Sequence, residues 1–222
     1  FNKSNAELTK EELLTFLEGS QASIIGKEFI TTSLLDKLPK LEVISKYGVG
    51  LDTIDQEACK KHNVSFLWTP GVNKRDVAEM TLGFMLGLIR NLYPTSIQLK
   101  DGTWYKNGGQ QLSNKTIGII GIGNIGKELV TLLNPFNVTL LGNDIINQDE
   151  YYQNNKIKEV SKEEIFANSD IITIHTPLTE KTRYLINKET LSQMKQTSFI
   201  INTARGKIIN EKHLLDALKT NQ

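Results

Sequence analysis

The sequence predicts a mixed α/β fold built on parallel strands, and three features indicate it. Short apolar runs alternate with segments of helical periodicity along the 222 residues, which is the pattern of parallel strands joined by crossover helices. The segment TIGIIGIGNIG at 116–126 passes from an apolar run through closely spaced glycines into a helix-forming stretch. The run FIIN at 199–202 has the character of a strand buried on both faces. We therefore expect a series of βαβ units.

Helix caps and breakers mark the first elements. Thr9 and Glu12 form a capping box that opens a helix, and Gly19 ends it. Asp55 is placed to cap a second helix, and Pro39 ends a short one between them. This part is predicted to hold helices at 10–17, 33–38 and 56–62 and strands at 22–25, 41–45 and 64–67.

The stretch WTPG at 68–71 interrupts this alternation, because Pro70 and Gly71 end a strand before a long helix from about Lys74 to Arg90. We place a domain boundary here, which gives domains at 1–69 and 70–222. The helix is apolar on more than one face between Asp76 and Arg90. We expect it to be buried on both sides, either as a core helix alone or as a core helix that also forms a subunit interface.

The rest of the chain resumes the alternation after the connecting segment at 100–115. Ser161 with Glu164, Asn187 and Asn210 are candidate helix N-caps. Strands are predicted at 117–120, 138–141, 171–174 and 199–202, and helices at 125–133, 161–167, 188–194 and 211–219.

Bulk properties restrict the class of protein. The chain exceeds the usual size of one domain, which favours two. Its 26 Lys and Arg residues balance 25 Asp and Glu residues, and no run of like charge suggests a nucleic-acid partner. No apolar stretch is long enough to cross a bilayer, and the N-terminus does not resemble a signal peptide. Cys59 is the only cysteine, so we expect a buried thiol in a cytoplasmic protein, with no metal site.

The glycine-rich turn is the strongest functional signal. A GxGxxG pattern alone is weak, but here a strand precedes it and a helix follows. Gly121 permits a tight turn, Gly123 lets backbone approach a pyrophosphate, and Gly126 lets helix and strand pack closely. The alternative is a structural βαβ turn without a ligand.

Two further groups would complete a dinucleotide site. The amides of Asn124 and Ile125 lie at the positive end of the helix, where phosphates bind. Asp144 ends the next strand and would accept hydrogen bonds from the adenine ribose. A 2′-phosphate would meet this carboxylate, and the following INQ supplies no Arg or Lys to receive it. The sequence therefore predicts NAD as the cofactor rather than NADP.

Arg205 follows the buried strand at 199–202, at the sheet edge where cofactors bind, and Gly206 after it permits an unusual backbone angle. A guanidinium there offers a planar pair of donors to a carboxylate and the adjacent carbonyl of a 2-oxo acid. The alternative is an arginine paired with a local carboxylate.

Five segments together resemble the D-isomer-specific 2-hydroxyacid dehydrogenase family, in its phosphoglycerate-dehydrogenase-like branch. They are YGVGLDTID, TPGVNKRDVAE, NKTIGIIGIGNIGK, HTPLTEKT and INTARG, in the same order from about residue 40 to the end. The resemblance implies a Rossmann-type doubly wound domain hinged to a flavodoxin-like substrate-binding domain, with an active site in the cleft. It also implies a homodimer.

The resemblance assigns roles to individual positions. The backbone of Tyr47, Gly48 and Val49 would hold the substrate carboxylate, and Asn73 would approach the active site. Lys46 stands where many relatives carry Arg, which puts a second anionic group on the substrate in doubt. The cofactor would be bound by the glycine turn and by Val77, Asp144, His175, Thr176, Pro177, Thr182, Thr203, Ala204 and Arg205, with His175, Thr176 and Pro177 along its adenosine half and Thr203 and Ala204 along its nicotinamide half.

By the same resemblance Arg205 is the catalytic arginine, and the family's catalytic glutamate and proton-donating histidine are expected beyond it. His62, His175 and His213 stand at other positions and are expected to be structural or solvated. Phe1 is not a natural start and Gln222 comes just after a helix, so we expect both domains to be incomplete and the chain alone to lack its acid.

The implied activity is an NAD-dependent oxidoreductase that interconverts a small 2-oxo acid and its D-2-hydroxy acid. Phosphoglycerate, hydroxypyruvate and glyoxylate are candidate acids, and formate or phosphite oxidation on the same scaffold stays open. The alternative from another class is an NAD-sensing binding protein that resembles the corepressors on this scaffold.

Overall fold

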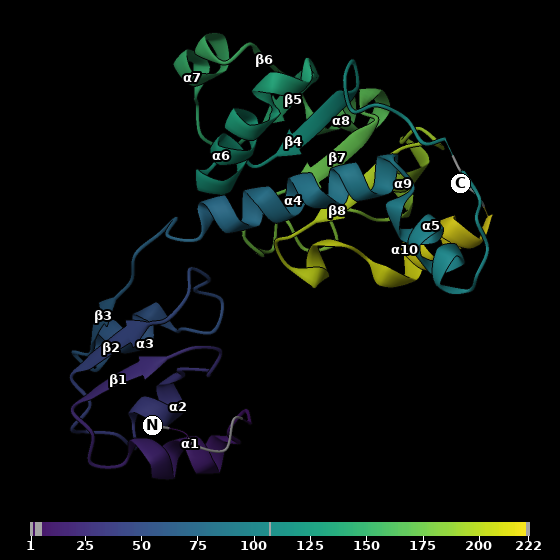
Figure 1. Cartoon of the computed structure of the whole chain (residues 1–222). Helices are drawn as coiled ribbons and strands as arrows, with labels where there is room; N and C mark the ends of the chain where they lie inside the picture. Colours follow the sequence, from purple (N-terminus) through teal and green to yellow (C-terminus); the bar gives the residue numbers. More distant parts are fainter. Residues whose placement is uncertain (1, 3–5, 107, 221–222) are drawn as a thin grey trace. The chain divides into compact units, whose positions relative to one another are not determined.

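The computed structural model describes residues 2, 6–106 and 108–220 (Figure 1). The chain divides into two compact units, residues 1–73 and 74–222. The division falls at the start of the long helix, whereas the sequence analysis placed the domain boundary between residues 69 and 70. Phe1 and Gln222, on which the expectation of missing sequence rests, lie outside the described residues.

The first unit is a three-stranded parallel sheet in the order β1-β2-β3. Its core gathers the buried faces of helices and strands, with Leu13, Leu35, Ile44 and Cys59 among its members. The elements are α1 (Lys10–Leu17), β1 (Ala22–Ile25), α2 (Thr32–Leu35), β2 (Val43–Lys46), α3 (Gln56–Lys61) and β3 (Ser65–Leu67).

Local sequence accounts for most of these boundaries. The capping box of α1 is confirmed, because Glu12 N donates to Thr9 Oγ1 (3.2 Å) and Thr9 N donates to Glu12 Oε2 (2.8 Å). Strand β1 is confirmed at 22–25, while β2 begins two residues later than predicted. The helix predicted at 33–38 is wrong in extent. It ends at Leu35, and the next residues form tighter i to i+3 turns before Pro39.

The second unit is a five-stranded parallel sheet in the order β6-β5-β4-β7-β8. The chain moves outward from β4 to β6, then crosses back to place β7 on the other side of β4. This is the doubly wound arrangement, whose switch point lies between β4 and β7. The strands are β4 (Thr116–Ile120), β5 (Thr139–Asn143), β6 (Ile157–Glu159), β7 (Ile171–Ile174) and β8 (Phe199–Asn202).

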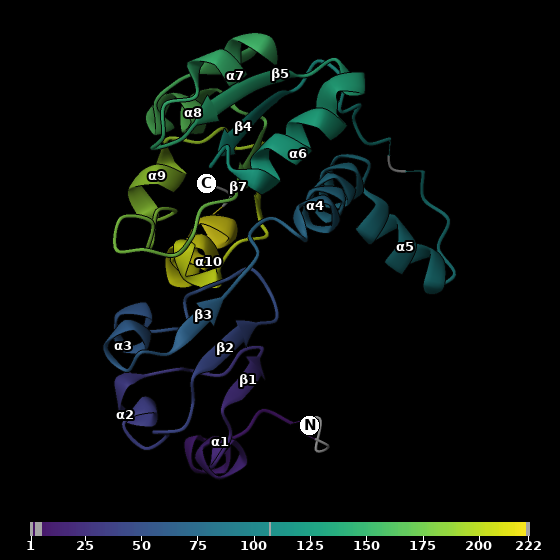
Figure 2. The same cartoon turned by 90° about the vertical axis from the view of Figure 1, so that its left-hand side faces the viewer.

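Helices cover both faces of this sheet, and each face has its own apolar core. One face carries α4 (Lys74–Ile89), α6 (Asn124–Leu133) and α7 (Asp149–Asn154), and the other carries α8 (Lys162–Asn168), α9 (Lys188–Ser192) and α10 (Glu211–Thr220) (Figure 2). Strand β7 is fully buried, as its composition predicts. The expectation that β8 is buried on both faces is wrong, because β8 lies at the edge of the sheet and only Ile201 of its four residues is buried. Helix α9 ends two residues earlier than predicted, and a turn closed by Met194 N on Leu191 O follows.

The expectation that α4 is buried on both sides is wrong within the described chain. Ala78, Met85 and Ile89 are buried, whereas Met80 and Phe84 are 47% and 39% exposed. The reason is that α4 packs against α6 and β8 on one side only. The opposite side of the helix carries apolar side chains that no element of the described chain covers.

Two α-helices and one strand were not predicted, and neither were the 3₁₀ turns at Asn134–Phe136 and Gly206–Ile208. Helix α5 (Leu92–Lys100) has no buried residue and holds Pro94 in its first turn, where the missing N–H is tolerated. Helix α7 and strand β6 are short, and two of the three residues of β6 are exposed. Among the described residues, no helix combines the length and apolarity needed to span a membrane. Cys59 is a buried thiol in α3, as expected.

Candidate dinucleotide-binding site

The glycine turn joins β4 to α6 at the switch point of the sheet. Gly121 has φ +97°, and a Cβ there would lie 2.8 Å from the carbonyl of His175 at the end of β7. A Cβ on Gly126 would lie 2.3 Å from the Gly121 oxygen. Both positions therefore exclude any side chain. Gly123 differs, since a Cβ built on it meets nothing within 4 Å, so an open space faces the turn at this residue.

The N-terminus of α6 faces the same turn. Gly123 is its N-cap and supplies no side chain, and Lys127 N makes the first backbone bond by donating to Gly123 O (2.9 Å). The amides of Asn124 and Ile125 precede that bond and belong to the unsatisfied N–H groups of a helix start. The arrangement fits an anion such as a pyrophosphate.

Asp144 is held against the glycine turn by two backbone amides. Its Oδ2 accepts from Ile122 N (2.7 Å) and its Oδ1 accepts from Ile146 N (3.1 Å). Gln148 Nε2 also donates to Ile122 O (2.9 Å). Each carboxylate oxygen keeps a lone pair for a further donor such as a ribose hydroxyl. Sequence reasoning found the carboxylate but not the amide that joins it to the turn.

The loop after β8 carries Arg205 and is held by Asn202, the last residue of the strand. Asn202 Oδ1 accepts from Ala204 N (3.0 Å), and its Nδ2 donates to Arg205 O (2.9 Å). Arg205 is partly buried, and its Nη1 donates to Ala204 O (3.0 Å). Sequence reasoning missed Asn202, although a short amide side chain just before TARG is a usual device for fixing a turn.

His175 contacts the loop after β8 as well as its own strand. Its Nε2 lies 2.9 Å from Thr173 Oγ1, and its Nδ1 lies 3.5 Å from Thr203 Oγ1. Desolvation lowers the pKa of the ring to about 4, so the imidazole is neutral at pH 7. The structure therefore connects His175 to Thr203, a residue that the resemblance assigned to the nicotinamide half.

The segment after His175 is a tight turn that is held by hydrogen bonds between its own residues. Thr182 Oγ1 donates to Pro177 O (2.6 Å), and Thr179 N donates to Thr182 Oγ1 (2.8 Å). Among the described residues, the buried Oγ1 of Thr176 meets no hydrogen-bond partner. Thr176 and Pro177 thus lie at the carboxyl edge of β7, next to the glycine turn that contacts His175.

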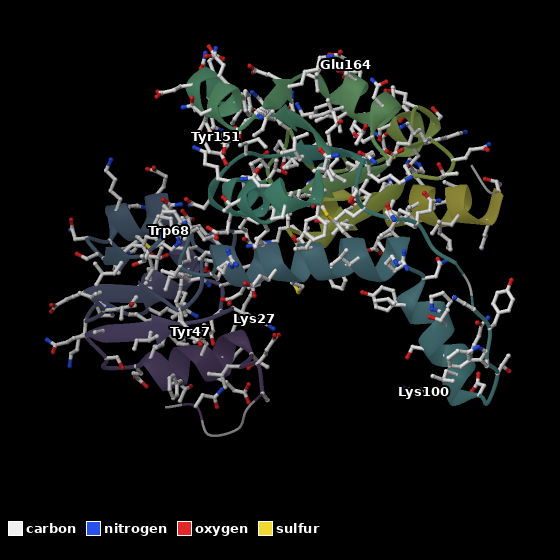
Figure 3. All side chains as sticks on the ribbon, turned by 45° about the horizontal axis from the view of Figure 1, so that its top comes forward. Lys27, Tyr47, Trp68, Lys100, Tyr151 and Glu164 are labelled. Atoms are coloured by element: carbon white, nitrogen blue, oxygen red, sulfur yellow. The ribbon has the colours of Figure 1, made fainter. Side chains whose placement is uncertain are left out.

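The candidate substrate residues at 46–49 lie in the first unit, at the end of β2 and directly after it. Lys46 Nζ donates to Gly26 O, and Gly48 has φ +118°. Tyr47 is 82% exposed, and Trp68 Nε1 donates to Val49 O (3.1 Å); Figure 3 labels both aromatic residues.

Two other predicted site residues flank the start of α4. Asn73 has a buried Oδ1 that meets no partner in the part of the chain that the structure describes. Val77 is partly buried, and its carbonyl accepts from Thr81 Oγ1 (2.8 Å).

Comparison with known proteins gives consistent matches. The family model for the D-isomer specific 2-hydroxyacid dehydrogenase NAD binding domain matches residues 82–222. The chain is 36% identical over 216 residues to D-3-phosphoglycerate dehydrogenase of Methanocaldococcus jannaschii, covering 96% of the chain and 41% of that protein. It is 33% identical over 223 residues to hydroxypyruvate reductase of Thermotoga maritima, covering 97% and 72%.

A solved structure matches as well. The NAD-dependent formate dehydrogenase of Staphylococcus aureus in complex with NAD superposes with a TM-score of 0.84 and is 38% identical, covering 95% of this chain and 65% of that one. The chain spans less than half the length of the D-3-phosphoglycerate dehydrogenase that it matches.

Proposed function

The chain belongs to the D-isomer-specific 2-hydroxyacid dehydrogenase family, and we propose that it forms part of an NAD-dependent oxidoreductase that interconverts a small 2-oxo acid and its D-2-hydroxy acid. One observation carries the proposal. Asp144 at the glycine turn and Arg205 after β8 both stand at the carboxyl edge of one parallel sheet, where such sheets bind ligands.

The residues present fit NAD, which supplies the group that accepts or donates the hydride. The open space at Gly123 and the uncapped start of α6 suit the pyrophosphate. Asp144 is already fixed by two amides, so its remaining lone pairs can receive the ribose hydroxyls without a rearrangement. A 2′-phosphate would meet this carboxylate directly, and we propose NAD rather than NADP for that reason.

Arg205 is the proposed catalytic residue. Asn202 fixes the backbone on both sides of Ala204 and so fixes the origin of the arginine side chain. The guanidinium would bind the substrate carboxylate and polarise the neighbouring carbonyl. Lys46 binds the Gly26 carbonyl, so within the first unit the backbone of 47–49, rather than this ammonium group, is the proposed substrate-binding feature.

Substitutions at two glycines should separate fold from cofactor binding. Gly126→Ala places a methyl group against the Gly121 oxygen and should lower the free energy of unfolding by about 1–3 kcal/mol. Gly123→Ala meets no atom and should keep the stability, yet weaken NADH binding about tenfold, because the methyl group fills the approach to the pyrophosphate. Urea unfolding and NADH fluorescence titration measure the two effects. Unchanged NADH affinity in a folded Gly123→Ala would contradict the assignment of the turn.

A substrate screen tests the function itself. The full-length protein would be supplied with NADH and, separately, with hydroxypyruvate, glyoxylate, pyruvate and a phosphorylated 2-oxo acid, while absorbance reports NADH oxidation. We expect turnover with at least one of them. Formate with NAD is the second candidate, because the formate dehydrogenase is 38% identical over 95% of the chain. Binding of NADH without turnover of any compound would favour the NAD-sensing binding protein instead.

We also propose a homodimer formed through the uncovered side of α4 and α5. Helix α5 has no buried residue, although an isolated helix of its length is marginal in water. Figure 1 shows α5 projecting from the end of α4. The patch consists of Met80, Phe84, Leu92, Tyr93, Ile97, Leu99, Trp104 and Tyr105, all large and exposed. A second copy would cover it with the same apolar side chains.

A charge in this patch should therefore break the dimer. Ile97 is 62% exposed on α5, and Leu218 is 67% exposed on α10 and serves as the matched control. We expect a dimer for the wild type and for Leu218→Asp and a monomer for Ile97→Asp, measured by light scattering after size exclusion. A wild-type monomer would refute the proposal, and so would a stable Ile97→Asp dimer.

A further inference from the structure

Four side chains form a continuous hydrogen-bonded series from β7 to α4, which we name the threonine–histidine chain. Thr173 Oγ1 lies 2.9 Å from His175 Nε2, and His175 Nδ1 lies 3.5 Å from Thr203 Oγ1. Thr203 Oγ1 then lies 3.2 Å from Thr81 Oγ1, which donates to Val77 O at 2.8 Å. The bond between Thr81 and Thr203 joins residues that lie 122 positions apart in the sequence. Thr173 and Thr81 are fully buried at its two ends.

The direction of every bond follows from the last one. A carbonyl oxygen only accepts, so the single hydroxyl hydrogen of Thr81 goes to Val77 O. Thr203 must therefore donate to Thr81, and this bond uses the single hydroxyl hydrogen of Thr203. His175 must then donate to Thr203 from a protonated Nδ1, and its Nε2 must accept from Thr173. Each of the three hydroxyl groups and the ring N–H donates once.

The reverse direction is disfavoured. It would have His175 donate from Nε2 to Thr173, and the hydroxyl hydrogen of Thr173 would then need another acceptor. No other side-chain bond of Thr173 occurs among the described residues, and its side chain is fully buried. An unpaired buried donor of this kind is unfavourable, because it gives up its hydrogen bond to water and gains none in return. A charged imidazolium would fail for the same reason, because it donates from both nitrogens.

We propose that His175 is a positioning residue that, as the neutral Nδ1–H tautomer, holds Thr203 in place and so fixes the loop that carries Arg205. The inference rests on the proposed function, in which Arg205 acts on the substrate. Asn202 holds Ala204 N and Arg205 O, but within the described chain its side chain makes no hydrogen bond to that of Thr203. The threonine–histidine chain supplies that support and ties the loop to the first turns of α4.

The two ring nitrogens of His175 then have different tasks. Nδ1 donates to Thr203 in the loop that carries Arg205. Nε2 only accepts a hydrogen bond from Thr173, which lies in β7, the strand that directly precedes His175. Asparagine places its amide near the position of Nδ1, and glutamine places its amide near the position of Nε2. His175→Asn and His175→Gln therefore test the two ring nitrogens separately, and both replacement side chains are polar and uncharged.

A spectroscopic test needs no turnover. The protein would be labelled with ¹⁵N at histidine, and the signals of His175 would be identified by their loss in His175→Gln. At neutral pH we expect a protonated Nδ1 and an unprotonated Nε2 in long-range ¹H–¹⁵N spectra. A protonated Nε2, or rapid exchange between the two tautomers as in a solvated histidine, would overturn the proposal. This result is independent of whether the protein reduces a 2-oxo acid.

The kinetic test compares the two variants in the full-length protein on an acid from the substrate screen. We expect His175→Gln to lower kcat about tenfold, since a small displacement of a catalytic group has an effect of at least this size. His175→Asn should retain kcat within about threefold, because its amide can still donate to Thr203. Dissociation constants for NADH should differ less between the variants than kcat does. Equal losses in both variants, or a loss that follows their melting temperatures, would refute the positioning role.

Discussion

Replacement of Arg205 by alanine is expected to lower kcat/KM for the 2-oxo acid by about 10²–10³-fold, the usual effect of removing a group that stabilises developing charge on a substrate oxygen. The guanidinium is the group proposed to bind the carboxylate and the carbonyl at once. Asn202 holds the backbone on both sides of Ala204, so the loop should keep its course when the side chain is removed. NADH affinity should change little.

Two further substitutions sharpen this test. Arg205→Lys keeps the charge but loses the planar pair of donors, so it should recover only part of the activity. Lys207 is an exposed cation two residues further along the same loop, and Lys207→Ala should leave kcat/KM unchanged. Steady-state kinetics on the full-length protein give all three values. Turnover at wild-type level in Arg205→Ala would remove this residue from the mechanism.

The strands at 22–25, 171–174 and 199–202 could be predicted from the sequence to the residue. Each contains a short apolar run bounded by polar residues, which is the composition of parallel strands, although only β7 is buried along its whole length. Strand β6 lacks this signal, because only Ile157 of its three residues is buried. Helix α5 lacks an apolar stripe facing its own unit. Elements that contribute little to the core leave little pattern in the sequence.

In the candidate site, residues of a local sequence motif could be predicted, whereas contacts between positions far apart in the sequence could not. Gly121, Gly126 and Asp144 belong to a motif whose spacing is fixed by one βαβ unit, so the pattern was sufficient to find them. The bond from Thr203 to Thr81 joins positions 122 apart, and the bond from Ile122 N to Asp144 uses a backbone amide. Neither leaves a periodic trace. Such contacts require the fold before they can be recognised.

The choice between NAD and NADP should depend mainly on Asp144. Its carboxylate is fixed at the glycine turn, and Ile145 and Ile146 beyond it are exposed apolar residues without charge. We expect the wild type to prefer NADH over NADPH by at least about 10²-fold in kcat/KM, since hydrogen bonds to a charged group contribute about 1.5–3 kcal/mol each. Asp144→Asn should bring the ratio close to one, because it removes both the charged acceptor and the repulsion of a 2′-phosphate.

The asparagine variant separates charge from structure better than alanine does. Its Oδ1 can still accept one of the two backbone bonds that the carboxylate now receives from Ile122 and Ile146, whereas Asp144→Ala loses both and should also loosen the glycine turn. Asp149 is an exposed carboxylate in the first turn of α7, so Asp149→Asn controls for a general change of surface charge and should keep the preference. Equal use of NADPH by the wild type would contradict the assignment. A preference that survives in Asp144→Asn would show that the shape of the turn, and not the charge at its edge, selects the cofactor.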